Sequence, residues 1–343
     1  MSQELEISIS SGSESFEKKE VKKIGLFGFG TVGKGLYDLL SKHISLPVEI
    51  HKVHIQRLDL ERINHPLDFT DDANDILDDP KIDIVVELIS DAEAAKHFVL
   101  NALAKGKPVI SANKKMIGSN IKEVDCWHRQ FEAPFFYEAA VGGGIPILQN
   151  LDTVFAHQDI TEIHGILNGS SNYILSQMSS NNMSFEDALE EAQAKGFAEA
   201  NPSLDVDGLD ASYKLAILGY HSFGEIVDLK KIELETIRNI SKKDIQDAKR
   251  HKKKIKPVAS LKKIDGNYVC SIGPKPLSQT DSLFNVDNEN NAIEIDTAIS
   301  GNHLLVGKGA GAFPTGSAVI NDLRRVLKGE RYQKSRLQVL VPA

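Results

Sequence analysis

The sequence predicts an α/β fold in which a doubly wound parallel sheet is followed by a second unit of mixed α and β structure. In the first 112 residues, short apolar segments alternate with helical patterns, an order typical of a parallel sheet with helices on both faces. Beyond residue 256, strand-like segments follow one another without helices between them. Because the chain has 343 residues, two domains are expected.

Apolar periodicity and helix-end signals place the elements of the first unit. The first strand leads directly into a helical pattern that carries Val32, Leu36 and Leu39 on one face. A helix over residues 93–104 ends at Gly106, because glycine readily adopts the left-handed conformation that follows a helix. Strands are expected over residues 21–27, 48–55, 82–89 and 108–112.

The second unit begins after a glycine-rich turn near Glu138, where the alternation stops. One of its helices opens with a capping box formed by Ser184 and Asp187, and another begins near Leu209 with Asp207 as the expected N-cap. Helices are expected over residues 171–178, 184–194 and 315–327 and from 209 onward, with strands over 160–167, 256–264, 267–273, 292–299 and 303–308.

These elements divide the chain into domains. Residues 21–137 form the first domain, which the C-terminal helix, about 308–343, completes, and residues 138–307 form the second. Residues 1–20 are polar and acidic, without the apolar stretch of a secretory signal, so we expect a mobile tail and a cytoplasmic protein.

Composition excludes several classes of function. The net charge of −8 argues against a nucleic-acid partner, and the apolar runs are too short to span a membrane. Cys126 and Cys270 have no metal-type spacing, so neither a disulfide framework nor a cysteine metal site is expected. The basic run over residues 248–257 is interpreted as a solvated helix face rather than an anion patch, because no aromatic residues accompany it.

Gly28, Gly30 and Gly33 spell G-x-G-x-x-G between the first strand and its helix. In such a loop the first glycine permits a tight turn, the second lets backbone approach a pyrophosphate, and the third lets the helix pack closely on the strand. Thr31 and Val32 open the helix, whose free N–H groups and positive dipole end favour an anion. The setting predicts a Rossmann-type sheet that binds NAD or NADP.

The choice between the two nucleotides depends on the end of the second strand. No acidic residue stands there to bind an adenine-ribose 2′-hydroxyl; Gln56 and Arg57 occupy the position instead. A guanidinium suits a 2′-phosphate, which favours NADP, although Arg57 as an ordinary surface residue remains an alternative.

Lysines and carboxylates form the candidate catalytic group. Lys114 follows a strand at the carboxyl edge of the sheet, where open α/β sheets bind ligands. Asp210 and Lys214 are four residues apart on one helix face, and Glu199 follows the helix stop at Gly196 by three residues. A lysine between two carboxylates keeps its charge and can deliver a proton. The alternative is a surface ion pair worth about 0.3–0.5 kcal/mol.

Several long motifs together resemble the homoserine dehydrogenase family, in the family's order and across residues 21–327. They are "GFGTVGKG" (28–35), "SANKKMIG" (111–118), "YEAAVGGGIPIL" (137–148), "GILNGSSNYIL" (165–175), "GFAEANPSLDVDGLDASYKLAIL" (196–218) and "GKGAGAFPTGSAVINDL" (307–323). The resemblance implies an α+β substrate and dimerisation domain beside the Rossmann domain. It also implies NAD(P)H-linked interconversion of L-aspartate 4-semialdehyde and L-homoserine, in threonine and methionine biosynthesis.

The resemblance assigns roles residue by residue. Lys214 matches the catalytic lysine, which protonates the substrate oxygen. The family's pattern implies substrate binding by Glu199, Asp210, Asp205, Lys114 and the backbone of Gly196; cofactor contacts at Gly28, Gly30, Thr31, Val32, Gly33, Ser90, Lys114 and Gly307; and a monovalent-cation site, usually sodium, at Glu138, Val141, Gly143 and Ile145. At Ser90 the sequence "SDAEA" departs from the glycine-rich turn or small hydroxylated residues that are commoner in the family.

By the same resemblance we expect a homodimer and no regulatory extension after Ala343. Two alternatives stay open at this point. One is another Rossmann dehydrogenase that acts on an amino-acid aldehyde or a 2-oxo acid. The other is a nucleotide-sensing protein without catalysis, which would have no need of the lysine and its carboxylates.

Overall fold

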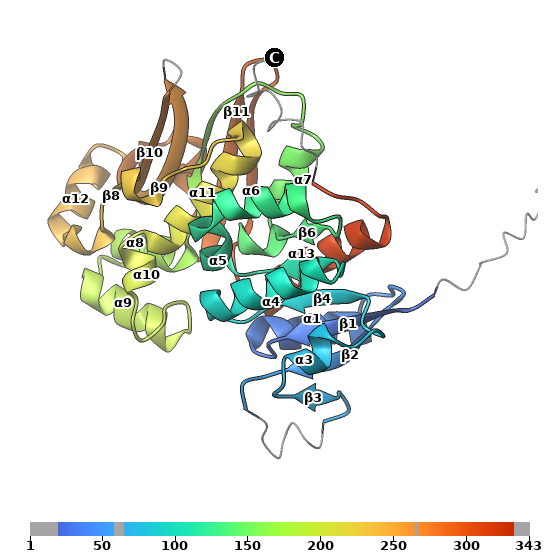
Figure 1. Ribbon diagram of the computed structural model, residues 1–343. Helices are drawn as coiled ribbons and strands as arrows, with labels where there is room; N and C mark the ends of the chain where they lie inside the picture. The colour runs from blue at the N-terminus through green and yellow to red at the C-terminus, as the bar shows by residue number, and fades with distance from the viewer. Residues whose placement is uncertain (1–19, 58–64, 265–266, 333–343) are drawn as a thin grey trace, which may run out of the picture.

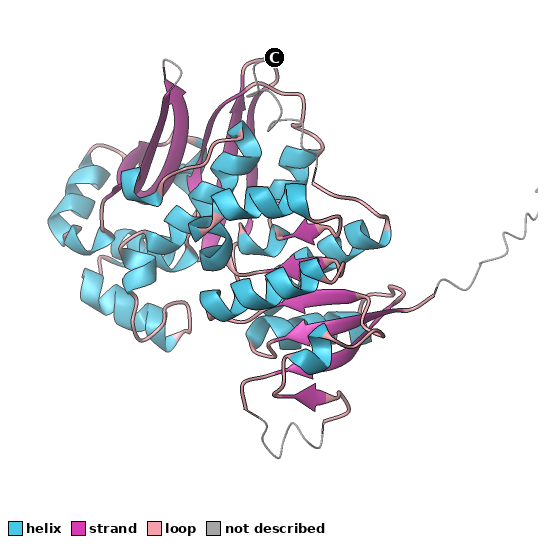
Figure 2. Ribbon diagram, viewed as in Figure 1, coloured by secondary structure: helices cyan, strands magenta, loops and turns pink. Residues whose placement is uncertain are grey.

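The computed structural model describes residues 20–57, 65–264 and 267–332. The tail expected over residues 1–20 lies outside the described residues apart from Glu20. Two six-stranded sheets organise the chain, and helices lie between and around them (Figures 1 and 2). The α/β prediction, with a parallel sheet first and a mixed unit second, is confirmed.

The first sheet is parallel throughout, with the strand order β3-β2-β1-β4-β5-β6. This is the doubly wound order of dinucleotide-binding sheets, and its direction reverses between β1 and β4. The four expected strands agree with the structure to within two residues at each end. The strands are β1 (Lys22–Phe27), β2 (Val48–His54), β3 (Phe69–Thr70), β4 (Ile84–Glu87), β5 (Val109–Ser111) and β6 (Phe135–Phe136).

Helices cover the first sheet, and one of them comes from the C-terminal part of the chain. A Cβ atom on Gly35 would lie 2.4 Å from the carbonyl oxygen of Ala312, so α1 and α13 pack with their backbones almost in contact. The helices outside the second unit's own set are α1 (Thr31–Lys42), α3 (Asn74–Leu77), α4 (Ala92–Ala104), α5 (Lys114–Ser119), α6 (Ile121–Gln130) and α13 (Ala312–Leu327). The 3-10 turn η1 (Glu138–Ala140) and helix α7 (Ile147–Asp152) follow the last strand of this sheet.

The second sheet has the order β12-β11-β7-β9-β10-β8 and is antiparallel except where β8 joins β10. Its strands are β7 (Ile160–Ile166), β8 (Glu233–Leu234), β9 (Lys253–Ile264), β10 (Asn267–Ser278), β11 (Asn290–Thr297) and β12 (Gly301–Lys308). The accompanying helices are α8 (Gly169–Asn181), α9 (Phe185–Ala194), α10 (Ser203–Val206), α11 (Leu209–Phe223) and α12 (Lys242–Arg250), with 3-10 turns η2 (Leu229–Lys231), η3 (Ile237–Asn239) and η4 (Ser282–Asn285).

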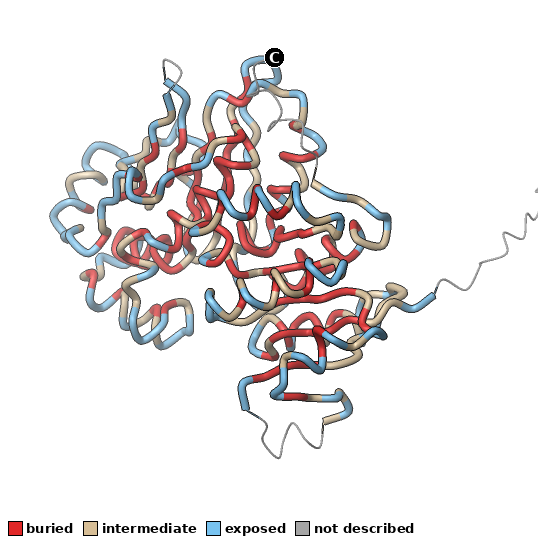
Figure 3. The backbone as a smooth tube through the Cα atoms, in the orientation of Figure 1, coloured by how far each residue is buried: buried red, intermediate tan, exposed pale blue. Residues whose placement is uncertain are grey.

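Helix α11 lies between the two sheets, and its middle is buried on all sides (Figure 3). Leu215 and Ile217 are fully buried, and each such side chain contributes about 1.5–3 kcal/mol of transfer free energy. Gly219 lets the helix approach β9, because a Cβ there would lie 2.8 Å from a methyl carbon of Leu261. This packing fixes the buried side chains of α11, Asp210 and Lys214 among them. None of the described helices is long and apolar enough to cross a bilayer.

Two local predictions were wrong. Asp207 does not cap α11: the N-cap is Gly208, whose φ of +80° favours glycine, and Asp207 accepts a hydrogen bond from the Arg238 guanidinium at 2.8 Å. The basic run over residues 248–257 is not a solvated helix face, because it runs from α12 into β9. Within it Lys256 is buried and its ammonium lies 2.6 Å from the carboxylate of Asp287.

Candidate active site

The turn after β1 has the geometry of an anion cradle. Gly28 has a φ of +94°, and a Cβ on Gly33 would lie 2.4 Å from the Gly28 carbonyl oxygen. A Cβ on Gly30 would have no described atom within 4 Å, so the backbone there is open to a ligand. Gly30 is also the N-cap of α1, and no described side chain caps this helix, whose first residues are Thr31 and Val32. The turn therefore fits a pyrophosphate.

Contacts connect this turn with the ends of β4 and β5. A Cβ on Gly28 would lie 2.8 Å from the Leu88 carbonyl oxygen, just after β4. One residue on, the Ile89 carbonyl accepts a hydrogen bond from the Asn113 amide at 3.1 Å. Asn113 also caps α5 by accepting from the Met116 N–H at 2.9 Å, and this fixes the start of α5 at Lys114.

Two of the predicted cofactor residues, Ser90 and Arg57, are exposed on the surface. Ser90 is exposed in the segment between β4 and α4, on the same edge of the sheet as the glycine turn. Arg57 is exposed shortly after β2, next to residues 58–64, which lie outside the described residues.

Asp210 lies between two lysines. Its Oδ1 is 2.9 Å from the Nζ of Lys114, and its Oδ2 is 2.7 Å from the Nζ of Lys214. Lys214 also donates a hydrogen bond to the carbonyl oxygen of Leu167 at 2.6 Å. The sequence predicts one amine between two carboxylates, whereas the structure has one carboxylate between two amines; Glu199, the second expected acid, is exposed.

The pKa values of the two lysines are shifted in opposite directions. Burial lowers the pKa of Lys214, although the Asp210 carboxylate opposes the shift. The pKa of Lys114 is raised, mainly by attraction to Asp210, and Glu199 adds to it. Burial alone would raise the pKa of Asp210, but the two ammonium groups outweigh it and lower that pKa well below its usual range. Lys214 is thus the amine that gives up its proton more readily, as a proton donor needs.

Asn168 joins the acids of the site. Its amide donates to Asp205 at 2.7 Å and to Asp210 at 2.9 Å, while its own carbonyl oxygen caps α8 by accepting from the Ser171 N–H. Burial raises the pKa of Asp205. Sequence reasoning missed this role. The signal was a polar side chain directly after a strand, as at Asn113.

Gly196 and Glu199 lie on the loop after α9. Gly196 is exposed with a φ of +75°, and the backbone carbonyl of Glu199 accepts a hydrogen bond from the Gln193 amide at 2.9 Å. Both belong to the segment that leads through Asp205 to α11, although neither touches the Lys214 ammonium through a bond that the structure shows.

The segment after β12 returns to the same region. The Asn291 amide donates to the Leu167 carbonyl at 2.9 Å, the carbonyl that also binds the Lys214 ammonium. A Cβ on Gly309 would lie 2.1 Å from that Asn291 amide, so only glycine fits there. Gly307, two residues earlier, packs against Ile145. Sequence reasoning also missed Asn291, which no motif distinguishes.

The four residues predicted to bind a cation line one tight turn. Glu138 is buried, and its carboxylate accepts the N–H groups of Leu148 at 2.9 Å and Gln149 at 2.7 Å. Burial raises the pKa of Glu138 to about 7. The other three are Val141 and Ile145, which are buried, and Gly143, which has a φ of +56° and lies against the backbone of Gly309.

Comparison with known proteins identifies the family. The family model of homoserine dehydrogenase matches residues 146–323, and that of its NAD-binding domain matches residues 28–126. Homoserine dehydrogenase from Bacillus subtilis is 35% identical over 318 residues, which cover 90% of this chain and 73% of the relative. The enzyme from Synechocystis is 38% identical over 319 residues, with 89% and 73% covered.

Solved structures agree. The crystal structure of a homoserine dehydrogenase from Thiobacillus denitrificans superposes with a TM-score of 0.84 at 33% identity, covering 94% of this chain and 76% of that one. A hyperthermophilic archaeal homoserine dehydrogenase in complex with NADPH gives a TM-score of 0.76 at 27% identity, covering 91% and 99%. The chain therefore belongs to the homoserine dehydrogenase family, whose members are NAD(P)-dependent oxidoreductases.

Proposed function

We propose that this chain interconverts L-aspartate 4-semialdehyde and L-homoserine with Lys214 as general acid and base. The observation that carries the proposal is the Lys114–Asp210–Lys214 group, which the contacts of Asn113 and Ile89 connect to the glycine turn. The proposed proton donor and the proposed nucleotide-binding turn are therefore connected through neighbouring residues.

Bound NAD(P)H supplies the hydride that reduces the aldehyde carbon. The Lys214 ammonium stabilises the negative charge that develops on the substrate oxygen and delivers a proton to it. Its lowered pKa favours this transfer, and in the reverse direction the neutral amine accepts the hydroxyl proton. The Asp210 carboxylate holds the Lys214 Nζ at 2.7 Å and so orients it for both directions.

The substrate's α-ammonium calls for carboxylates, because charge-assisted hydrogen bonds of this kind are the strong ones. We assign this binding to Glu199, Asp205 and Asp210, with the backbone of Gly196 beside them. Asp205 is held by Asn168, which keeps it next to Asp210. Lys114, with 44% of its side chain exposed, is accessible to both substrate and cofactor.

For the cofactor we propose NADP in preference to NAD, held by Gly28, Gly30, Thr31, Val32, Gly33, Ser90, Lys114 and Gly307. The open backbone at Gly30 and the uncapped start of α1 fit the pyrophosphate of either nucleotide. Arg57 supports the preference, because an exposed guanidinium after β2 can bind a 2′-phosphate.

A monovalent cation, sodium by preference, is proposed at Glu138, Val141, Gly143 and Ile145. The donors available there are a carboxylate and backbone carbonyls, and oxygen donors suit a hard cation. The Glu138 carboxylate, already bound to two N–H groups, retains lone pairs for such an ion. A nearby cation would also favour the ionised carboxylate.

A homodimer and a cytoplasmic location in threonine and methionine biosynthesis complete the proposal. The dimer is supported by Val269, Leu304 and Val306, large apolar side chains that are 42–54% exposed on strands of the second sheet. The reducing cytoplasm is supported by Cys126 and Cys270, which are free thiols.

The test is oxidation of L-homoserine by the full chain, followed at the nicotinamide absorbance band with NADP and then with NAD. We expect turnover with both nucleotides and a larger kcat/KM with NADP. Turnover of other amino-acid alcohols or 2-hydroxy acids, with none of L-homoserine, would instead support a different dehydrogenase. A larger kcat/KM with NAD would contradict the cofactor preference alone.

A further inference from the structure

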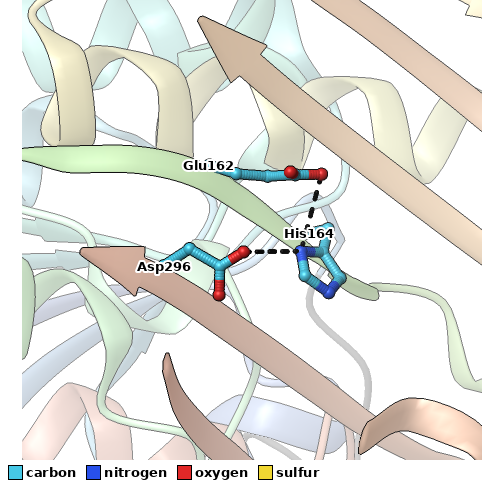
Figure 4. A group of neighbouring side chains, drawn as sticks. All are labelled: Glu162, His164 and Asp296. Carbon is cyan, nitrogen blue, oxygen red and sulfur yellow. Dashed lines mark ion pairs between the residues drawn. The ribbon is translucent and has the colours of Figure 1, made fainter. Parts of the chain in front are cut away.

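A second group of titratable side chains lies on the second sheet, apart from Lys214. Glu162 and His164 come from β7, and Asp296 comes from the neighbouring strand β11 (Figure 4). One ligand-type atom from each of the three lies within 4.8 Å of the others. The proposed reaction uses none of them.

The distances fit ligands around an ion better than they fit hydrogen bonds. The Nδ1 atom of His164 is 3.7 Å from Oε1 of Glu162 and 4.0 Å from Oδ2 of Asp296, and both separations are too long for a hydrogen bond. Two ligand atoms that bind one tetrahedral zinc ion at about 2.1 Å are about 3.4 Å apart. Small side-chain rotations would therefore bring all three atoms onto a common ion.

Glu294 holds the imidazole in the orientation that this binding requires. Its carboxylate lies 3.0 Å from Nε2 of His164, and its side chain is only 7% exposed. Glu294 is itself fixed, since it also accepts hydrogen bonds from Ser282 and Asn302. With the proton on Nε2, the lone pair of Nδ1 faces Glu162 and Asp296. Nδ1 is inaccessible to solvent and has no hydrogen-bond partner among the described residues.

The register of the strands concentrates negative charge around this nitrogen. Asp296 stands directly opposite Glu162 across the β7–β11 ladder, and Glu294 stands opposite His164. Like charges in directly opposite positions destabilise a sheet. Lys262 compensates part of this charge, with its Nζ 2.9 Å from Oε2 of Glu162. Oδ1 of Asp296 is buried without a described hydrogen-bond partner, so this acid is the least satisfied of the three.

We propose that Glu162, His164 and Asp296 bind one divalent transition-metal ion, zinc by preference, with Glu294 as the residue that positions the histidine. One imidazole nitrogen and two carboxylate oxygens leave a fourth position for water, as in mononuclear zinc sites. The carboxylate–histidine–metal arrangement is the usual way in which a ligand histidine is oriented. The ion would tie β7 to β11 and remove the repulsion between the facing acids.

The experiment measures Zn²⁺ binding to the metal-free full chain, with a chromophoric chelator as competitor. We expect one Zn²⁺ per chain, loss of that site in His164→Asn, and at least about tenfold weaker binding in Glu162→Gln and Asp296→Asn. Glu294→Gln should weaken binding by about 10–100-fold. The matched control is His157→Asn, because His157 is exposed in the loop before β7 and should leave the affinity unchanged.

A second readout uses the unsubstituted chain alone, so that an unfolded variant cannot decide the outcome. Co²⁺ in the site should show the intense visible absorption of a four-coordinate ion, and added Zn²⁺ should abolish it. Equal zinc affinity in His164→Asn and the unsubstituted chain would overturn the proposal. So would the absence of both Zn²⁺ and Co²⁺ binding to the unsubstituted chain.

Discussion

Lys214 differs from an ordinary lysine because of three neighbours that the chain brings together from separate segments. Asp210 lies one helical turn before it, the Leu167 carbonyl comes from the end of β7, and Asn291 holds that carbonyl from β11. Lys214 is only 7% exposed, so its ammonium group is largely removed from solvent. In the reaction we propose, proton transfer depends on this one amine, because attraction to Asp210 raises the pKa of Lys114.

Lys214→Ala should therefore reduce turnover of L-homoserine by about 10²–10⁴-fold, the usual contribution of a positioned proton donor. Nucleotide affinity should stay nearly unchanged, because the glycine turn is not altered. Steady-state kinetics and NADPH fluorescence titration measure the two effects. Lys115→Ala is the matched control, since Lys115 is exposed on α5 next to the site. Turnover retained in Lys214→Ala would remove Lys214 from proton transfer.

At the scale of the elements, the contact between α1 and α13 joins the two ends of the described chain. Backbone atoms of Ala312 would lie 2.4 and 2.6 Å from a Cβ on Gly35. In an exposed helix the change from Gly to Ala stabilises the helix by about 1 kcal/mol. At Gly35 the higher helix propensity of alanine is therefore opposed by the close contact with Ala312. We expect the steric clash to outweigh this preference, because both helices also pack against the first sheet and neither backbone can move without disturbing that packing.

We expect Gly35→Ala to destabilise the fold by about 1–3 kcal/mol, the usual cost of overpacking. Lys34→Ala is the control on the same helix, since Lys34 is exposed and takes the same new side chain. Urea unfolding followed by circular dichroism compares the two. If Gly35→Ala proved as stable as Lys34→Ala, the contact between α1 and α13 would be looser than described.

Elements longer than three residues were predictable when a local pattern defined them. The apolar runs at β1 and β4 and the capping box at the start of α9 are of this kind. The strands β3, β6 and β8 were missed, because two residues show no periodicity. They are strands only because a neighbouring strand supplies their hydrogen bonds.

At the scale of the whole molecule, buried acids make stability depend on pH. Glu87 is fully buried at the end of β4, and burial raises its pKa from 4.5 to about 7, although Ser111 and the Ile89 N–H donate hydrogen bonds to it. The folded chain keeps this proton where the unfolded chain has lost it. The free energy of unfolding should therefore fall as pH rises from about 4.5 to about 7, with a contribution of about 3 kcal/mol.

Glu87→Gln should flatten this dependence, because an amide has no proton to lose and can still bond with Ser111 and the Ile89 N–H. The measurement is the free energy of unfolding in urea at pH 5 and at pH 8. We expect the free energy of unfolding to fall less between pH 5 and pH 8 in the variant than in the unsubstituted chain. Glu93→Gln is the control, since Glu93 is exposed on α4. An unchanged pH dependence in Glu87→Gln would show that this carboxyl is ionised in the folded chain.

Most residues of the candidate site could be predicted from the sequence, but the contacts between them could not. The helical spacing of Asp210 and Lys214 and the position of Lys114 after a strand are local features. The roles of Asn168 and Asn291 are not, because each depends on a partner far away in the chain, Asp210 for Asn168 and Leu167 for Asn291. The division of the chain between residues 137 and 138 remains a prediction.

The sequence by itself determined the two kinds of sheet, the glycine turn and the lysine–acid helix, because periodicity and glycine conformation act over a few residues. Only the tertiary structure decided that Asp210 lies between two amines, that Lys256 is buried, and that Glu162 and Asp296 face each other. Those facts depend on which strands and helices become neighbours. Burial then sets the electrostatics of each group, since a charge removed from water responds to every neighbour at short range.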